Sequence, residues 1–263
     1  MNNIISNFGQ IVQQATERGL PLKKKAILRE YLQAKFVSHF YSFPEANKLS
    51  FVGGTSLRLL RGLPRFSEDL DFDNLGLNDK QILALVEKIV EIFLLENIEV
   101  ELKVTQREYK NYFEFHFPNL LHHLKITTNP KEKLNIKLDY ASHWQGQSTQ
   151  VILFNQYGFI ERVVTNQLDQ LVVQKLAAYA GRKRTQARDL YDVVWLYAQG
   201  ARLDDKFLKA NQHEELVSKA IEKFKQEGAT KSLKQRLKPF LLNSTDVDKI
   251  ELLGDVLQEM RAA

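Results

Sequence analysis

The sequence predicts an α+β fold in which a mixed sheet flanked by helices is followed by a helical bundle. A helical pattern covers residues 1–46, strand patterns dominate from about residue 98 to 163, and helical patterns return after Thr165. Helices and strands therefore alternate in the first part of the chain, and only helices fill the second. We expect an α/β domain over residues 1–163 and a helical domain over residues 164–263.

The composition is that of an ordinary globular protein, with 44% hydrophobic and 26% charged residues among 263. Cysteine is absent, which excludes disulfides and thiolate metal sites and suits a reducing cytoplasm. We find neither an apolar run of membrane-spanning length nor a signal-peptide pattern, so we expect a cytoplasmic protein without a membrane partner. The net charge of +5 favours polyanionic partners without selecting one.

Local patterns predict the elements of the first part. Residues 1–46 are expected to form two helices that break at a Gly-Leu-Pro sequence, and residues 49–52 a short buried strand. A helix is expected to start right after a glycine pair, and the alternating segment 69–73 reads as a strand buried on one face. Residues 79–97 predict a strongly amphipathic helix capped by Asn78.

Four later stretches have strand character: IEVELKVTQ, YFEFHF, KLNIKLDYAS and VILFNQYGFIERVV. In the third, Leu134, Ile136 and Leu138 point one way, and the polar residues between them point the other. After Thr165 the sequence pattern is helical up to the end of the chain.

The glycine pair Gly53-Gly54 lies between the predicted strand and the next helix, in the segment FVGGTSLRLLRGLPRFSEDLDFD. Glycines let the backbone turn sharply and pass close to a bound group. The first amides of the helix, with the hydroxyls of Thr55 and Ser56, would seat phosphate oxygens. A glycine pair alone is more often a simple turn.

Three aspartates alternate in the strand that follows. Asp69, Asp71 and Asp73 project from one face, while Leu70 and Phe72 project into the core. Like charges on neighbouring positions repel, so they require solvent, cations or shifted protonation. Carboxylates at i and i+2 suit a magnesium ion that bridges a nucleotide's phosphates. The alternative is that the three aspartates simply lie on a solvent-exposed face of the strand.

In combination, the glycine turn, the helix and the acidic strand resemble the corresponding segment of the AbiEii/AbiGii toxin family. Members of this family are nucleotidyltransferases of the polymerase-β type. The match includes the approach Arg65-Phe66-Ser67 to the aspartates. The resemblance implies a metal pair at Asp69 and Asp71, with Arg65 and Ser67 beside it to touch phosphates or to position the acidic strand. It implies nucleotide binding by Gly53, Gly54, Thr55, Ser56, Arg65, Ser67 and Lys175.

Enzymes of this type usually carry a third carboxylate on a neighbouring strand, and NIKLDYAS supplies Asp139. By itself, Asp139 with Lys137 on the same face reads as a solvated charge pair. The resemblance favours Asp139 as third metal ligand or catalytic base.

The helix predicted from residue 166 holds an anomaly, because Lys175 falls on its apolar stripe. Such a lysine snorkels outward or meets an anion. The segment QKLAAYAGRKRTQARDLYDVVWL resembles the family's lysine motif and its RDxYD motif, which implies that Lys175 contacts the triphosphate and that Asp189 belongs to the active site. Arg188 and Asp192 are four residues apart, the spacing of an ion pair on a helix surface. This interpretation gives Asp192 a structural role.

The resemblance implies a toxin that transfers NMP from NTP to an acceptor with Mg²⁺, or Mn²⁺ in its place, and that a cognate antitoxin restrains. RNA, in particular the tRNA 3′ end, is the expected acceptor, and the basic run over residues 219–238 is compatible with it or with a solvated helix face. Two alternatives stay open: a small-molecule nucleotidyltransferase of the antibiotic-modifying kind, and a non-catalytic nucleic-acid-binding module. The six histidines lack zinc-site spacing, and there is no P-loop motif.

Overall fold

The computed structural model of this protein describes residues 4–107 and 110–262. They form two compact units, which are not consecutive in the sequence. The first consists of the described residues of Met1–Gly62, Phe66–Ser142 and Val151–Thr165, and the second of those of Leu63–Arg65, His143–Gln150 and Asn166–Ala263. The segment Leu63–Arg65 therefore belongs to the second unit, although the chain on both sides of it belongs to the first.

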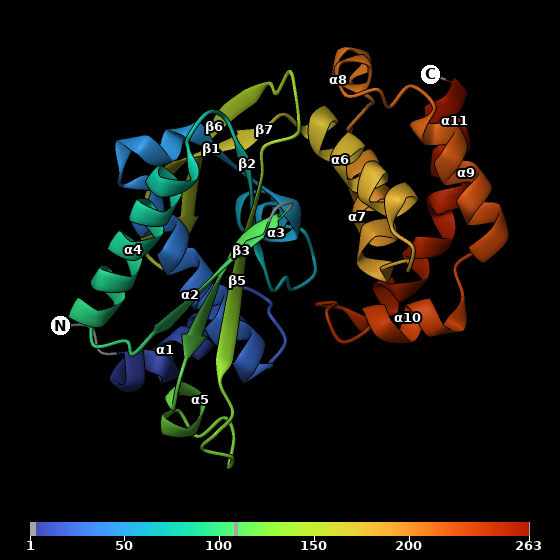
Figure 1. The fold of residues 1–263 in the computed structure, drawn as a ribbon. Coiled ribbons are helices and arrows are strands. Elements are labelled where there is room, and N and C mark those ends of the chain that lie inside the picture. Colours follow the sequence, from blue (N-terminus) through green and yellow to red (C-terminus); the bar gives the residue numbers. More distant parts are fainter. Residues whose placement is uncertain (1–3, 108–109, 263) are drawn as a thin grey trace. The chain divides into compact units, whose positions relative to one another are not determined.

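The strands are β1 (Leu49–Val52), β2 (Leu70–Asn74), β3 (Glu101–Arg107), β4 (Lys110–Phe117), β5 (Leu134–Ala141), β6 (Thr149–Gln156) and β7 (Phe159–Asn166). Five of them form one sheet in the order β1-β2-β5-β4-β3 (Figure 1). β2 and β5 run parallel, and the other neighbours run antiparallel. β6 and β7 form a separate two-stranded sheet. This mixed sheet confirms the predicted fold class.

Alternation along β2 decides which of its side chains enter the core. Leu70 and Phe72 are buried, and the ring of Phe72 lies 5.2 Å from that of Phe51 on β1. Neighbouring side chains of a strand point to opposite faces, so Asp71 points away from this aromatic core. The same alternation in β5 buries its apolar side chains, Leu134, Ile136 and Leu138.

The helices of the first unit are α1 (Ile4–Glu17), α2 (Lys24–Tyr41), α3 (Gly53–Arg61), α4 (Asp79–Leu95) and the short α5 (Leu120–His123), with a 3₁₀ turn η1 (Pro44–Lys48). α2 packs against α1, α4 and β5. Asn78 caps α4 as predicted, because its side chain accepts a hydrogen bond from the Gln81 amide while the Gln81 side chain accepts from the Asn78 amide.

The last stretch of predicted strand character forms a hairpin of β6 and β7. Tyr157 and Gly158, between β6 and β7, have φ angles of +54° and +82°. Two successive residues with positive φ reverse the chain tightly, and glycine adopts that geometry at little cost. The Tyr157 hydroxyl donates to Glu30 Oε1 at 2.9 Å, which fixes the turn against α2.

The second unit is helical. Its helices are α6 (Leu168–Gly181), α7 (Ala187–Ala198), α8 (Asp205–Ala210), α9 (Leu216–Glu227), α10 (Lys231–Leu237) and α11 (Leu253–Ala262), with a 3₁₀ segment η2 (Ser244–Leu252). α6 packs on α7 and α9, and α11 packs on α7 and α9. In the part of the chain that the structure describes, no helix has the length and apolar character needed to cross a bilayer.

Candidate active site

Gly53 is the point at which the chain turns from β1 into α3. Its φ of +75° is a conformation that residues with a side chain rarely adopt. A Cβ at this position would come within 2.7 Å of Asp71 Cβ and Cγ and would overlap with Oδ2. α3 begins at Gly53 itself, earlier than the sequence predicts, and includes the buried Gly54. The glycine turn and the acidic strand therefore meet in one site.

Asp71 and Asp139 are register partners on the parallel strands β2 and β5. Strands in a sheet are about 4.8 Å apart, and register partners present their side chains on the same face. Both aspartates are half-buried. Lys137, two residues before Asp139, places its ammonium 2.7 Å from Asp139 Oδ2. The sheet thus brings two carboxylates together and sets a positive charge beside one of them.

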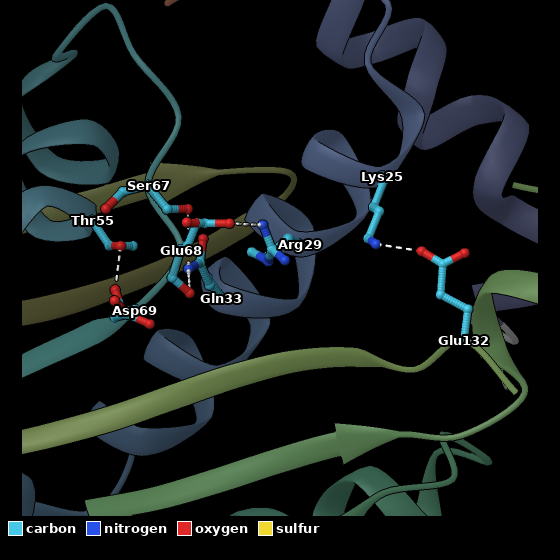
Figure 2. A network of polar contacts seen from close by, with 8 residues as sticks. All are labelled: Lys25, Arg29, Gln33, Thr55, Ser67, Glu68, Asp69 and Glu132. Carbon is cyan, nitrogen blue, oxygen red and sulfur yellow. Dashed lines mark hydrogen bonds and ion pairs between the residues drawn. The ribbon is translucent and has the colours of Figure 1, made fainter. Parts of the chain in front are cut away.

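Side chains from two helices hold the backbone that enters β2 (Figure 2). The Thr55 hydroxyl donates to the carbonyl of Asp69. The Gln33 amide on α2 donates to the carbonyls of Ser67, at 3.4 Å, and of Glu68, at 2.9 Å. Gln33 and Thr55 are each 1% exposed, so water does not compete for these bonds. We call Gln33 and Thr55, with these three carbonyls, the carbonyl clamp.

The clamp corrects one expectation from the sequence. Each hydroxyl carries a single proton, and that of Thr55 goes to the carbonyl of Asp69. The Ser56 hydroxyl is fully buried and donates to the carbonyl of Phe51 at 2.8 Å. The two hydroxyls therefore hold the turn instead of donating to phosphates. What α3 offers an anion is its first backbone amides.

The second unit contains a buried cluster of charges centred on Asp192. Arg65 makes a two-pronged contact with this carboxylate, Nε to Oδ1 and Nη2 to Oδ2, both at 2.6 Å. Lys175 Nζ lies 2.8 Å from Asp192 Oδ2. Burial opposes ionisation of Asp192, but Arg65 and Lys175 outweigh it, so the pKa of Asp192 lies below its ordinary value. The carboxylate is therefore held ionised in the core.

Asp189, on α7 like Asp192, is buried beside the same cations. Its Oδ2 lies 3.0 Å from Arg182 Nε, and the Arg182 side chain is half exposed. Burial raises the pKa of Asp189, although the charges of Lys175 and Arg182 act in the opposite direction. Asp189 and Asp192 thus differ in their preferred protonation state within one cluster.

Two interpretations from the sequence change with this cluster. The ionic partners that the structure gives Asp192 are Arg65 and Lys175, whereas the guanidinium of Arg188 lies over the ring of Phe240, 4.6 Å from its centroid. Arg65, which was expected to touch phosphates or to position the acidic strand, is 2% exposed and is bound through its guanidinium to Asp192. The anion that Lys175 meets within the chain is Asp192.

Gln33 is a site residue that sequence reasoning missed. It stands between Leu32 and Ala34 in an amphipathic helix, where an amide reads as a surface residue. Its near-complete burial and its two acceptors arise from the segment 67–69, more than thirty residues further along the chain. The one available signal was a polar residue inside an otherwise apolar run.

The acidic site has a donor set suited to a hard divalent cation. Mg²⁺ is usually bound by one or two carboxylates together with water and substrate phosphates. Asp71 and Asp139 are such a pair, and Asp69 precedes β2 on the same chain segment. Within the described residues, no group of three or more His, Cys, Asp or Glu side chains is gathered closely enough to hold a metal by itself. The residues thus fit a cation that shares its coordination with a phosphate.

Fold and site together define a nucleotidyltransferase. A family model described as "Nucleotidyl transferase AbiEii toxin, Type IV TA system" matches residues 35–256. The chain therefore belongs to the AbiEii nucleotidyltransferase toxin family. Members use an NTP and a divalent metal, and a toxin of such a system has a cognate antitoxin.

Solved structures agree with this fold. JHP933 from Helicobacter pylori is 19% identical, with a TM-score of 0.54 over 92% of this chain and 96% of that one. A candidate nucleotidyltransferase from H. pylori is 20% identical, with a TM-score of 0.53 over 92% of this chain and 98% of that one. No curated protein matches the sequence.

Proposed function

We propose that this protein is a Mg²⁺-dependent toxin of the cytoplasm that transfers NMP from an NTP to RNA, with the 3′ end of tRNA as the acceptor. The observation that carries the proposal is the contact between Gly53 and the Asp71 carboxylate, with Asp139 as register partner of Asp71. This arrangement places the turn that begins α3 beside two carboxylates of the kind that bind a divalent cation. Mn²⁺ would serve in place of Mg²⁺, because it also prefers oxygen ligands.

The chain's own residues would divide the work as follows. Asp69, Asp71 and Asp139 would hold the divalent cation, which neutralises charge on the triphosphate when bound. The backbone amides at Gly53, Gly54, Thr55 and Ser56 would face the phosphates, and Lys175 would balance the remaining charge. Ser67 and Arg65 would touch the phosphates or position the acidic strand. Asp189 would complete the active site.

The reaction needs little covalent chemistry from the protein. The oxygen of an acceptor hydroxyl forms a bond to the α-phosphorus, the bond to pyrophosphate breaks, and the hydroxyl proton passes to a base. Asp139 would be that base or a third metal ligand. Catalysis then depends on positioning and on electrostatic stabilisation of the transferred group.

Exposed positive charge supports an RNA acceptor. Five of the basic residues in the run 219–238 are exposed: Lys219, Lys225, Lys231, Arg236 and Lys238. Lys219 forms a surface ion pair with Glu215. The other two are engaged: Lys234 pairs with Asp248 and Glu251, and Lys223 donates to the carbonyls of Tyr179 and Arg182. Exposed lysines and arginines bind phosphates in a salt-dependent way.

The test is incubation of the protein with each α-labelled NTP, Mg²⁺ and total cellular RNA, followed by separation on a gel. Asp71→Asn should abolish transfer of label, and Asp79→Asn, an exposed aspartate at the start of α4, should leave it intact. Full transfer by folded Asp71→Asn would overturn the site. Label on small hydroxyl compounds instead of RNA would identify a small-molecule nucleotidyltransferase. RNA binding without pyrophosphate release from any NTP would identify a non-catalytic module.

A further inference from the structure

The cluster around Asp192 holds more positive than negative charge. Its cations are Arg65, Lys175 and Arg182, and its carboxylates are Asp189 and Asp192. Asp189 is the carboxylate for which burial favours the neutral form. Inside a protein, where the dielectric is low, such an excess of positive charge attracts an anion more strongly than it would in water. The cluster is therefore suited to a negatively charged ligand.

Solvent access within the cluster is uneven. The side chains of Arg65 and Asp192 are 2% and 0% exposed, whereas that of Lys175 is 15% exposed. The contact with Asp192 uses both Nε and Nη2 of Arg65, while the Lys175 ammonium, with three N–H donors, contacts Asp192 through Oδ2 alone. Of the two cations that contact Asp192, Lys175 is thus the one that a ligand from solvent can reach.

The backbone of Arg65 is fixed in the second unit independently of its side chain. Arg65 forms an isolated β-bridge with Leu241, and the amide of Leu242 donates to the carbonyl of Pro64 at 3.1 Å. These bonds hold the guanidinium at Asp192 before any ligand arrives. A buried charge needs such a prearranged partner, because leaving one member of a buried pair unpaired is strongly unfavourable.

We propose that Arg65 is a positioning residue that serves as the counter-ion of Asp192 and thereby keeps the charge of Lys175 available for the nucleotide's triphosphate. This inference rests on the proposed nucleotide contact of Lys175. With Arg65 in place, the single negative charge of Asp192 is balanced and Lys175 remains a net cation. Without Arg65, Asp192 neutralises Lys175, and the triphosphate has to compete with a buried carboxylate for the same ammonium.

The test is calorimetric titration with each NTP in the presence of Mg²⁺, using single and double variants. Lys175→Met and Arg65→Met should each weaken binding by roughly tenfold or more, the size expected for one charged hydrogen bond. The double variant Arg65→Met/Asp192→Leu should bind nearly as well as the wild type, because Lys175 then has no carboxylate to neutralise it. Replacing both partners of a buried pair by apolar residues is often neutral for folding, which keeps this variant measurable. Lys234→Met removes a positive charge from an exposed ion pair of the same unit and should not change affinity.

Each outcome separates the inference from the proposed function. If Lys175→Met weakens binding but Arg65→Met does not, Arg65 is no counter-ion and the nucleotide contact stands. Equal weakness of Arg65→Met and of the double variant would mean that Arg65 itself contacts the nucleotide, which overturns the inference. Unchanged affinity of Lys175→Met would remove the lysine contact and the inference with it. Absence of NTP binding by the folded wild type would overturn the proposed function itself.

Discussion

Gly53 lies directly against the carboxylate of Asp71, at the point where strand β1 becomes helix α3. No other residue fits there, because a Cβ would overlap with Asp71 Oδ2 and the backbone has a positive φ. The glycine is thus required by the carboxylate next to it and not by the turn alone. This pairing of a glycine turn with a carboxylate is the centre of the candidate site.

Gly53→Ala should abolish nucleotidyl transfer and should destabilise the fold by about 1–2 kcal/mol from the backbone conformation alone, with the clash added to it. Gly62→Ala is the matched control. Gly62 has a φ of +77°, but a Cβ there would meet nothing within 4 Å. We expect Gly62→Ala to lower stability against thermal unfolding by a similar amount, through the backbone alone. Nucleotidyl transfer by this variant should remain normal. Equal loss of transfer in both variants would show that helix stability, and not contact with Asp71, makes Gly53 necessary.

Thr55→Val should weaken binding of Mn²⁺ to the acidic site by roughly tenfold, the lower end of what loss of an outer-shell contact costs a metal site. The substitution keeps the shape but removes the donor from the carbonyl of Asp69, so that the backbone at this residue is less well fixed. Thr55→Ser restores the hydroxyl and should restore affinity. The measurement is titration with Mn²⁺ followed by electron paramagnetic resonance. Equal affinity for Val and Ser variants would contradict the positioning role of the clamp.

Lys137→Met should tighten Mn²⁺ binding several-fold. The ammonium lies 2.7 Å from Asp139 Oδ2, so it competes with a cation for this carboxylate. Lys133→Met is the control, because Lys133 forms an equally close pair with Glu101, which lies outside the proposed ligand set. Weaker Mn²⁺ binding after Lys137→Met would instead mean that the lysine holds Asp139 in its binding orientation.

Asp189→Asn should stabilise the protein increasingly as the pH rises from about 4, the ordinary pKa of aspartate, through the raised pKa of Asp189. Burial raises the pKa of Asp189 above its ordinary value. The stability that Asp189 contributes is therefore fully present below the ordinary pKa of aspartate and is lost as the pH rises through the raised pKa. An amide does not ionise, so the variant avoids that loss. Thermal melts of the wild type and the variant across this range measure the difference.

Asp192→Asn is the opposite case and serves as the comparison. The pKa of Asp192 lies below its ordinary value, so its stabilising contribution is present above that value and is lost as the pH falls through the lowered pKa. Asp192→Asn should therefore be less stable than the wild type at neutral pH. If both substitutions shift the melting temperature in the same direction at about pH 8, the assignment of opposite protonation preferences is wrong.

The sequence predicted the parts of the site that depend on local pattern. The alternation in 69–73 correctly predicted that Leu70 and Phe72 are buried, although Asp73 is buried as well. The Gly53-Gly54 pair marked the turn, because strand period and glycine conformation are properties of short segments. Asn78 as helix cap and the apolar face of β5 followed from the same kind of reasoning. Residue order within motifs also sufficed to indicate the family that the comparison then showed.

The chain order also predicted, correctly, a mixed sheet followed by helices, because the period of the hydrophobic residues changes from two to three or four along the chain. What needed the tertiary structure was every partnership between distant residues. Gln33 reaches the segment before Asp69, and Arg65 and Lys175 share Asp192, across separations that no local pattern encodes. The hydroxyls of Thr55 and Ser56, which in the sequence look like donors to a ligand, donate to backbone carbonyls instead. Buried donors require acceptors, and the fold supplies these carbonyls. The sequence by itself thus determined which residue types face one another within an element, and the fold decided which charges cancel and which remain for a ligand.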